Sequence, residues 1–475
     1  MSGLELLGLV MLVVMLGAIF IGVPISFTLL FLALIFGFIG LGPRVFDLAY
    51  LQTLGLMKQD EFVAVPMFIL MGYVCDQAGL MERLFKAFRD LFAPVRGALY
   101  LVVIATATLF GIAAGTVGAT VVLLGIMAGP MMIKSGYDVK MSAGAITAGG
   151  TLGILIPPSV MLVVMGPVLG VSVLQLYAAA FGPGFLLAAM YMVYTMGRSF
   201  LNPKLGPPVP KEEREPSLRI ILWECVVGLV PVTVLTLATL GAILAGLTTA
   251  TEAAALGALG AILLVVAYGR FSWKGLFHAC HSTLATTSMV LFLAVTSNIF
   301  GAVFARLGTA TWITQALVSM PLPAWGTMTL LLMLIFLLGW PFEWPAIVLI
   351  FLPMLAPVAT GLGYDMVWFG TISAVVLQTA FLSPPVAMSA YYLKQAVREW
   401  SLGTIYRGMY QFMVIQCICV VLVLAFPQIA LWFPQWLEAG DRMATPALKE
   451  DAPDSSSLEA GDSLMRDVDK PGLDK

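Results

Sequence analysis

Long stretches of the chain contain no Asp, Glu, Lys or Arg. Crossing about 30 Å of hydrocarbon takes about 20 apolar residues in a helix, so each stretch predicts at least one membrane helix or helical hairpin. We therefore expect an all-α polytopic membrane protein with about ten to thirteen membrane segments, some of them re-entrant. The stretches are Leu6–Pro43, Gly97–Ile133, Met141–Gly197, Cys225–Thr251, Gly275–Ala305, Leu307–Phe342, Met366–Leu393 and Gly408–Leu437.

The composition agrees with this class of protein. Of the 475 residues, 60% are hydrophobic and 11% are charged, whereas a soluble domain has roughly 45–50% apolar and about 25% charged residues. With 24 basic against 26 acidic residues, the chain has no basic excess with which to bind nucleic acid. These numbers exclude a soluble enzyme, a nucleic-acid binder and a disordered scaffold.

Charge is concentrated in a few short segments. Residues 206–216 form a polar, proline-rich linker near the middle of the chain, and residues 441–475 form an acidic tail that we expect to be disordered because it can bury little apolar surface. The basic segments Arg83–Arg96 and Arg198–Arg219 are candidates for the cytoplasmic side under the positive-inside rule.

An internal repeat divides the chain at this linker. We predict a first repeat over residues 1–205 and a second over 217–440. The match rests on six identities at one offset of 227: Pro130, Gly136, Tyr137, Asp138, Pro157 and Pro158 return as Pro357, Gly363, Tyr364, Asp365, Pro384 and Pro385.

Each half then contains the same two parts. An interrupted apolar segment predicts a re-entrant hairpin, at about 105–133 and about 326–360, and a double proline predicts a broken helix, at about 139–175 and about 366–394. Non-helical backbone survives at membrane depth only when it is buried in protein or lines a wet cavity. The pattern matches secondary transporters, whose binding sites lie between inverted repeats, although a proline kink can also be purely structural.

The candidate Na⁺ and substrate site residues follow from these interruptions, because glycine permits close backbone approach and hydroxyl or carbonyl oxygens suit Na⁺. Half-helix N-termini, in turn, suit a carboxylate. In the first repeat the candidates are Gly111, Gly115, Thr116, Gly118, Thr120, Gly149, Thr151, Gly153, Pro157, Pro158 and Ser159. In the second repeat they are Gly339, Glu343, Gln378, Thr379, Ser383, Pro384 and Pro385.

Three polar residues inside apolar stretches are further candidates. Glu343 would ligate Na⁺, carry a proton, or lie at an interfacial tip where water removes the cost of its charge. Glu252 is expected to be a buried acid that joins a polar network between helices or binds an ion, and Asn298 is interpreted in the same way. No spacing of His, Cys and acids suggests a transition-metal site.

At this point the motifs carry a resemblance to a known family. The string from Gly149 to Ser159 that contains Pro157-Pro158, the Gly136–Asp138 turn before it, and Thr251–Ala255 resemble the large membrane (M) subunit of TRAP transporters, the tripartite ATP-independent periplasmic family. The likeness covers about residues 4–435. This sequence differs from the family at the two predicted hairpin tips. The first tip of the family is more often rich in serine, and the second more often contains glycine and aspartate.

The resemblance implies a permease subunit in the bacterial inner membrane that imports organic acids with Na⁺ as the coupling ion and no organic cofactor. A small four-helix membrane subunit would accompany it, and a periplasmic substrate-binding protein would deliver a C4-dicarboxylate, a 2-oxo acid or a similar carboxylate. The fold would be of the ion-transporter superfamily elevator type. The alternatives are a stand-alone carboxylate carrier that needs no binding protein, and a membrane enzyme or channel, for which the chain offers no convergent catalytic set.

Overall fold

The computed structural model describes residues 2–114, 117–209, 217–384 and 387–444, and within these ranges the chain is helical. Residues before the linker form ten α-helices. Their bounds are α1 Gly3–Phe20, α2 Ile25–Leu41, α3 Arg44–Met57, α4 Glu61–Ala78, α5 Leu80–Phe92, α6 Ala98–Ala114, α7 Val117–Lys134, α8 Val139–Leu155, α9 Val160–Leu169 and α10 Val173–Leu201.

The rest of the chain adds further α-helices and three short segments, η2 to η4, of π or 3₁₀ geometry. The first group is α11 Leu218–Thr236, η2 Leu237–Gly241, α12 Ala242–Leu244, α13 Ala250–Ala267, α14 Trp273–Arg306 and α15 Thr309–Val318. The second group is α16 Ala324–Leu338, α17 Trp344–Ala346, η3 Ile347–Phe351, α18 Leu352–Gly361, α19 Met366–Leu377, η4 Gln378–Phe381, α20 Met388–Ala396, α21 Leu402–Ala425 and α22 Gln428–Ala444.

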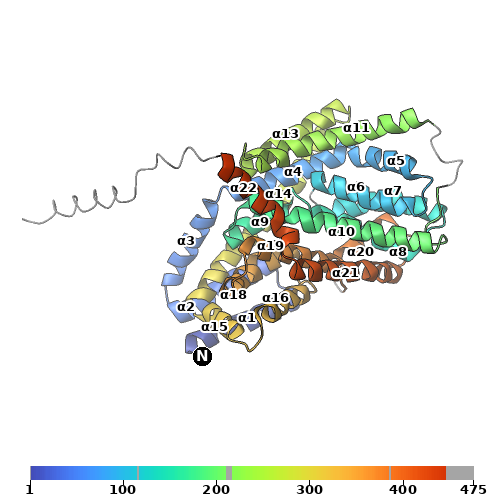
Figure 1. The fold of residues 1–475 in the computed structure, drawn as a ribbon. Helices are drawn as coiled ribbons and strands as arrows, with labels where there is room; N and C mark the ends of the chain where they lie inside the picture. The colour runs from blue at the N-terminus through green and yellow to red at the C-terminus, as the bar shows by residue number, and fades with distance from the viewer. Residues whose placement is uncertain (1, 115–116, 210–216, 385–386, 445–475) are drawn as a thin grey trace, which may run out of the picture.

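Within the described ranges, nine helices are long and apolar enough to cross a membrane, or ten if the bent pair α8–α9 is one span. Four shorter apolar helices, including α16 and α19, add to these. The predicted multi-pass membrane protein is therefore confirmed. Figure 1 shows α1, α2, α3 and α15 gathered at one end of the molecule and α5, α6, α7 and α11 at the other.

The segments predicted as hairpins and as broken helices are each divided into shorter helices among the described residues. Helices α6 and α7 cover the first predicted hairpin, and α16 with α17, η3 and α18 covers the second. The first broken helix bends by 45° between α8 and α9. It ends earlier than expected, because Gly170 adopts a left-handed conformation with φ of 66° that ends α9. The second broken helix passes from α19 through η4 to α20.

The Gly-Tyr-Asp turns of the two halves have the same local structure. Gly136 and Gly363 adopt φ values of 70° and 81°, a region that favours glycine. Asp138 then accepts a hydrogen bond from the Met141 backbone N–H, and Asp365 accepts one from that of Trp368, both at 2.8 Å. Each aspartate is thus the N-cap of the helix that leads to a break.

Helices α8 and α19 run in opposite directions, as their contacts with α21 reveal. Gly408 and Phe412 of α21 lie against Lys140 and Gly144 of α8, so these two helices run the same way. By contrast, the start of α19 meets the end of α21, since the indole N–H of Trp368 donates to the Val423 carbonyl at 3.4 Å. The two capped helices therefore enter the molecule from opposite ends.

The two basic segments lie together on one side. Gly97 N–H donates to the Gly206 carbonyl at 2.8 Å, and Val209 N–H donates to the Ala93 carbonyl at 3.2 Å. The first residues of the expected linker are therefore paired with the loop after α5. Helix α5 itself is amphipathic, with Leu80, Leu84 and other apolar residues buried.

Candidate functional site

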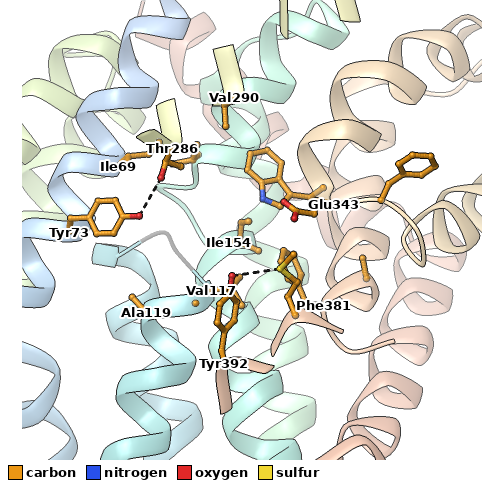
Figure 2. A pocket seen from close by; sticks show the side chains of 16 residues that line it. Ile69, Tyr73, Val117, Ala119, Ile154, Thr286, Val290, Glu343, Phe381 and Tyr392 are labelled. Atoms are coloured by element: carbon orange, nitrogen blue, oxygen red, sulfur yellow. Dashed lines mark hydrogen bonds between the residues drawn. The ribbon is translucent and has the colours of Figure 1, made fainter. Parts of the chain in front are cut away.

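A cavity of about 270 Å³ lies where the two hairpin tips and the two helix breaks meet. The start of α7 contributes Gly118, and the second tip contributes Glu343. Helix α20, which follows the second break, contributes Tyr392. The opposite wall comes from α4 and α14, with Tyr73 and Thr286. Figure 2 shows these elements around one space.

Glu343 is the acidic residue of the cavity wall. Its side chain is exposed and makes no capping hydrogen bond to the helix that follows. Among the described residues that line the cavity, none is basic. Glu343 lines this cavity, and the three interpretations of its carboxyl group in the sequence stay predictions.

Close backbone contacts hold each tip against the neighbouring break. A Cβ atom at Gly111 would lie 2.5 Å from the Cα of Gly153, and one at Gly339 would lie 2.9 Å from the Cβ of Ala380. Real Cβ atoms do not approach so closely without displacing their neighbours. These glycines therefore position the tips, whereas Gly118, whose Cβ would contact the Tyr392 ring at 3.1 Å, borders the cavity itself.

The remaining candidates of the first repeat are buried behind the cavity. Thr120, Pro157 and Pro158 are buried, and a Cβ at Gly149 would meet Ala107 at 3.3 Å. The Thr151 hydroxyl donates to a carbonyl one turn earlier in its own helix. These residues shape the break without lining the cavity.

Ser159 has a more specific place at the first break. It is fully buried, and its hydroxyl donates to the carbonyl of Ile154, which the break leaves without its helical partner. Its own carbonyl accepts from the Tyr177 hydroxyl at 3.5 Å. Side-chain groups thus satisfy the backbone that the double proline interrupts.

The second break holds polar atoms that are buried and unpartnered. Gln378 is completely buried, and neither atom of its amide has a hydrogen-bond partner among the described residues. The Ser383 hydroxyl is in the same situation. Thr379 instead donates to the Val376 carbonyl at 2.6 Å, and Pro384 is exposed. Unpartnered buried groups cost about 1–3 kcal/mol each. Gln378, Thr379 and Ser383 are not among the residues that line the cavity.

Three candidates, Gly115, Thr116 and Pro385, lie outside the described residues. They belong to the first tip and to the second double proline, and their assignment stays a prediction.

The interpretation of Glu252 as a buried acid is wrong. Its side chain is exposed and accepts from the Thr249 N–H at 2.9 Å, while Thr249 Oγ1 accepts from the Glu252 N–H at 3.3 Å. This reciprocal pair is a capping box at the start of α13. The carboxylate therefore caps the start of α13 and does not join a buried network.

Asn298 does connect two helices, because its amide donates from α14 to the Gln52 carbonyl of α3 at 3.1 Å. It lies apart from Glu343, in a second cavity of about 360 Å³. That cavity is bounded by α3 and α14 on one side and by α9, η3 and α18 on the other. The two cavities thus follow one another along α14.

Sequence reasoning missed the polar side chains that α4, α14 and α20 bring to the first cavity. The Tyr73 hydroxyl lies 3.3 Å from Thr286 Oγ1, and the Tyr392 hydroxyl lies 3.7 Å from Met388 Sδ. The sequence does show that these polar side chains lie within apolar stretches, which marks them as candidates for a functional site. Their convergence depends on the packing of helices far apart in the sequence.

The chain is similar to characterised transport proteins over nearly its whole length. It is 30% identical to the sialic acid TRAP transporter large permease protein of Vibrio cholerae, over 88% of this chain and 96% of that protein. It is 29% identical to the C4-dicarboxylate TRAP transporter large permease protein of Pseudomonas aeruginosa, over 79% of this chain and 86% of that protein. Both relatives are permeases rather than enzymes.

A likeness in fold extends to a solved structure, that of the Alcanivorax borkumensis YdaH transporter. The two superpose with a TM-score of 0.58 at 16% sequence identity, over 81% of this chain and 88% of the other. The family model of the tripartite ATP-independent periplasmic transporter, DctM component, matches residues 10–429. The chain belongs to this family and is the large membrane subunit of a TRAP transporter.

Proposed function

We propose that this chain is the permease subunit of a Na⁺-driven importer of small organic acids in the bacterial inner membrane. The observation that carries the proposal is the meeting of both hairpin tips and both helix breaks at one cavity. Secondary transporters place substrate and coupling ions where discontinuous helices of two inverted repeats meet. The opposite directions of α8 and α19 support such an inverted arrangement.

Na⁺ as the coupling ion is supported by the chemistry of the second break. Gln378 and Ser383 offer neutral oxygen atoms that are buried and without partners among the described residues. Unwound backbone at a break offers further carbonyl oxygens, which are the usual ligands of Na⁺ in such transporters. These residues would hold the ion, and its binding would remove the cost of leaving their oxygens unpartnered.

A carboxylate on the substrate is supported by the helix ends at the cavity. Val117 is the first residue of α7 and Val160 is the first residue of α9, and both line the cavity. A helix N-terminus carries roughly half a positive charge, which favours an anion. The carboxylate would therefore lie at this side of the cavity.

Alternating access of the elevator type is supported by the succession of two cavities along α14. Thr286 and Val290 line the first cavity, and residues from Ala294 to Ala305 line the second. We propose that the hairpins and broken helices move along α14, which with α3 and α4 belongs to the scaffold. The first cavity would then become accessible from each side of the membrane in turn.

Two partners complete the proposed transporter, as the tripartite family implies. A small four-helix membrane subunit would pack on the scaffold within the lipid bilayer, and a periplasmic substrate-binding protein would deliver the organic acid. A stand-alone carrier is the second candidate. Reconstitution of this chain alone and with both partners separates the two, since only a stand-alone carrier transports without them.

The decisive experiment is uptake into proteoliposomes that contain the complete transporter. An inward Na⁺ gradient should drive accumulation of at least one labelled organic acid from a panel that includes succinate, 2-oxoglutarate and sialic acid. Replacement of Na⁺ by K⁺ should abolish accumulation. The proposal is wrong if no member of the panel accumulates in response to Na⁺ when the binding protein is shown to bind that member.

A further inference from the structure

The wall of the first cavity has an unusual charge pattern for a site that takes organic acids. Among the described lining residues, Glu343 is the acidic residue and no basic residue accompanies it. The wall is also rich in aromatic side chains, namely those of Tyr73, Phe342, Trp344, Phe381 and Tyr392. A simple dicarboxylate would find nothing cationic to bind here and one carboxylate that repels it.

These groups converge on one space. Figure 2 shows the carboxyl group of Glu343 and the hydroxyl groups of Tyr73 and Tyr392 reaching toward the cavity from different sides. Tyr392 is within electrostatic range of both Glu343 and Tyr73. Glu343 makes no capping hydrogen bond, so its carboxyl group is not engaged by the helix that follows.

A carboxylate beside aromatic rings favours one class of ligand. Aromatic faces attract organic cations, and sets of aromatic side chains recognise quaternary or methylated ammonium groups. An acid within about 4–6 Å favours the charged form of a cationic partner. The hydroxyl groups of Tyr73 and Tyr392 add hydrogen bonding at the rim of the same space.

We propose that the cavity takes a zwitterion, with its cationic nitrogen at Glu343 and the surrounding aromatic side chains and its carboxylate at the starts of α7 and α9. The placement of the ligand's carboxylate rests on the proposed function, whereas the placement of its cationic nitrogen rests only on the residues of the cavity wall. The substrate class is thus an amino or quaternary-ammonium acid, rather than a dicarboxylate.

The test is direct binding to the full chain, purified in lipid nanodiscs at saturating Na⁺. The probes are two matched pairs that differ only in the cationic nitrogen. Glycine betaine is compared with 3,3-dimethylbutanoate, in which carbon replaces nitrogen, and 4-aminobutanoate is compared with pentanoate. We expect the nitrogen-bearing member of at least one pair to bind at least tenfold more tightly than its carbon analogue.

Glu343→Gln should reduce that preference to less than threefold while leaving the protein folded, as judged by its melting temperature. The matched control is Glu252→Gln, because Glu252 is also exposed but belongs to the capping box of α13. That variant should keep the full preference. Tyr392→Leu should weaken binding of the nitrogen-bearing probe more than Tyr392→Phe, which retains the ring.

Three results would overturn the inference. The first is equal binding within both pairs, and the second is binding of neither nitrogen-bearing probe. The third is an unchanged preference in Glu343→Gln together with a weakened response to Na⁺, which would assign the carboxylate to the coupling ion. A failure of the proposed function is distinguishable, since it would appear as absent Na⁺-driven uptake while the preference for the nitrogen-bearing probe persists.

Discussion

Two buried glutamines make it possible to test whether Gln378 is a ligand of the proposed Na⁺ site. Gln378 and Gln416 are both completely buried. The amide of Gln378 has no hydrogen-bond partner among the described residues, whereas that of Gln416 lies beside the Tyr191 hydroxyl. Only Gln378 lies at a helix break, in η4, whereas Gln416 lies within the continuous helix α21. The same chemical change at the two positions should therefore have different consequences for Na⁺.

Gln378→Leu is expected to raise the Na⁺ concentration for half-maximal uptake at least tenfold, because it removes a proposed oxygen ligand. The melting temperature without Na⁺ should not fall, since replacing an unpartnered buried amide by an apolar group of similar shape is close to neutral or stabilising. Uptake by proteoliposomes at varied Na⁺ measures the first quantity. Gln416→Leu is the control, and an equal loss of Na⁺ response there would remove the assignment of Gln378.

Individual residues were predictable from the sequence where a local motif fixes their place. Gly118 and Glu343 were found at the cavity because each interrupts an apolar stretch near the tip of a predicted hairpin. Glu252 was misinterpreted, although a threonine followed by a glutamate three residues later, here Thr249 and Glu252, is the sequence signature of a capping box. The convergence of Tyr73 and Tyr392 on one cavity could not be predicted, since it depends on packing between segments more than 300 residues apart.

At the scale of elements, the two Gly-Tyr-Asp turns are the strongest sign that the halves are equivalent. Asp138 and Asp365 cap α8 and α19 with hydrogen bonds of the same length. The turn, cap and helix could be predicted because all three depend on neighbouring residues. The bend of 45° and the opposite directions of the two helices depend on tertiary packing, which no local pattern contains.

Asp138→Ala and Asp365→Ala are each expected to lower the free energy of unfolding by about 1 kcal/mol, the usual cost of losing an N-cap. Because the caps lie on different helices without shared partners, the double variant should lose about the sum of the two. Thermal unfolding of the purified chain in detergent measures this. Ser401, which caps α21 through the Thr404 N–H, provides a third position for comparison. A neutral Asp365→Ala would contradict the equivalence of the turns.

At the scale of the whole molecule, the second cavity is the space that the proposed elevator movement would enter. It is lined by α3 and α14 and by α9, η3 and α18, and it follows the first cavity along α14. A side chain that fills the second cavity should therefore stop the movement without harming the fold.

Gly301 offers the position for this change, because it lines the second cavity and a Cβ atom there would meet nothing within 4 Å. Gly301→Trp should leave the melting temperature unchanged or raise it, since any residue other than proline is favoured over glycine within a helix. Initial uptake rates in proteoliposomes should fall at least tenfold. Gly197→Trp in α10, where the space is also open, is the matched control and should transport normally. Normal transport by Gly301→Trp would mean that the moving helices never enter this cavity, and the elevator movement along α14 would then be wrong.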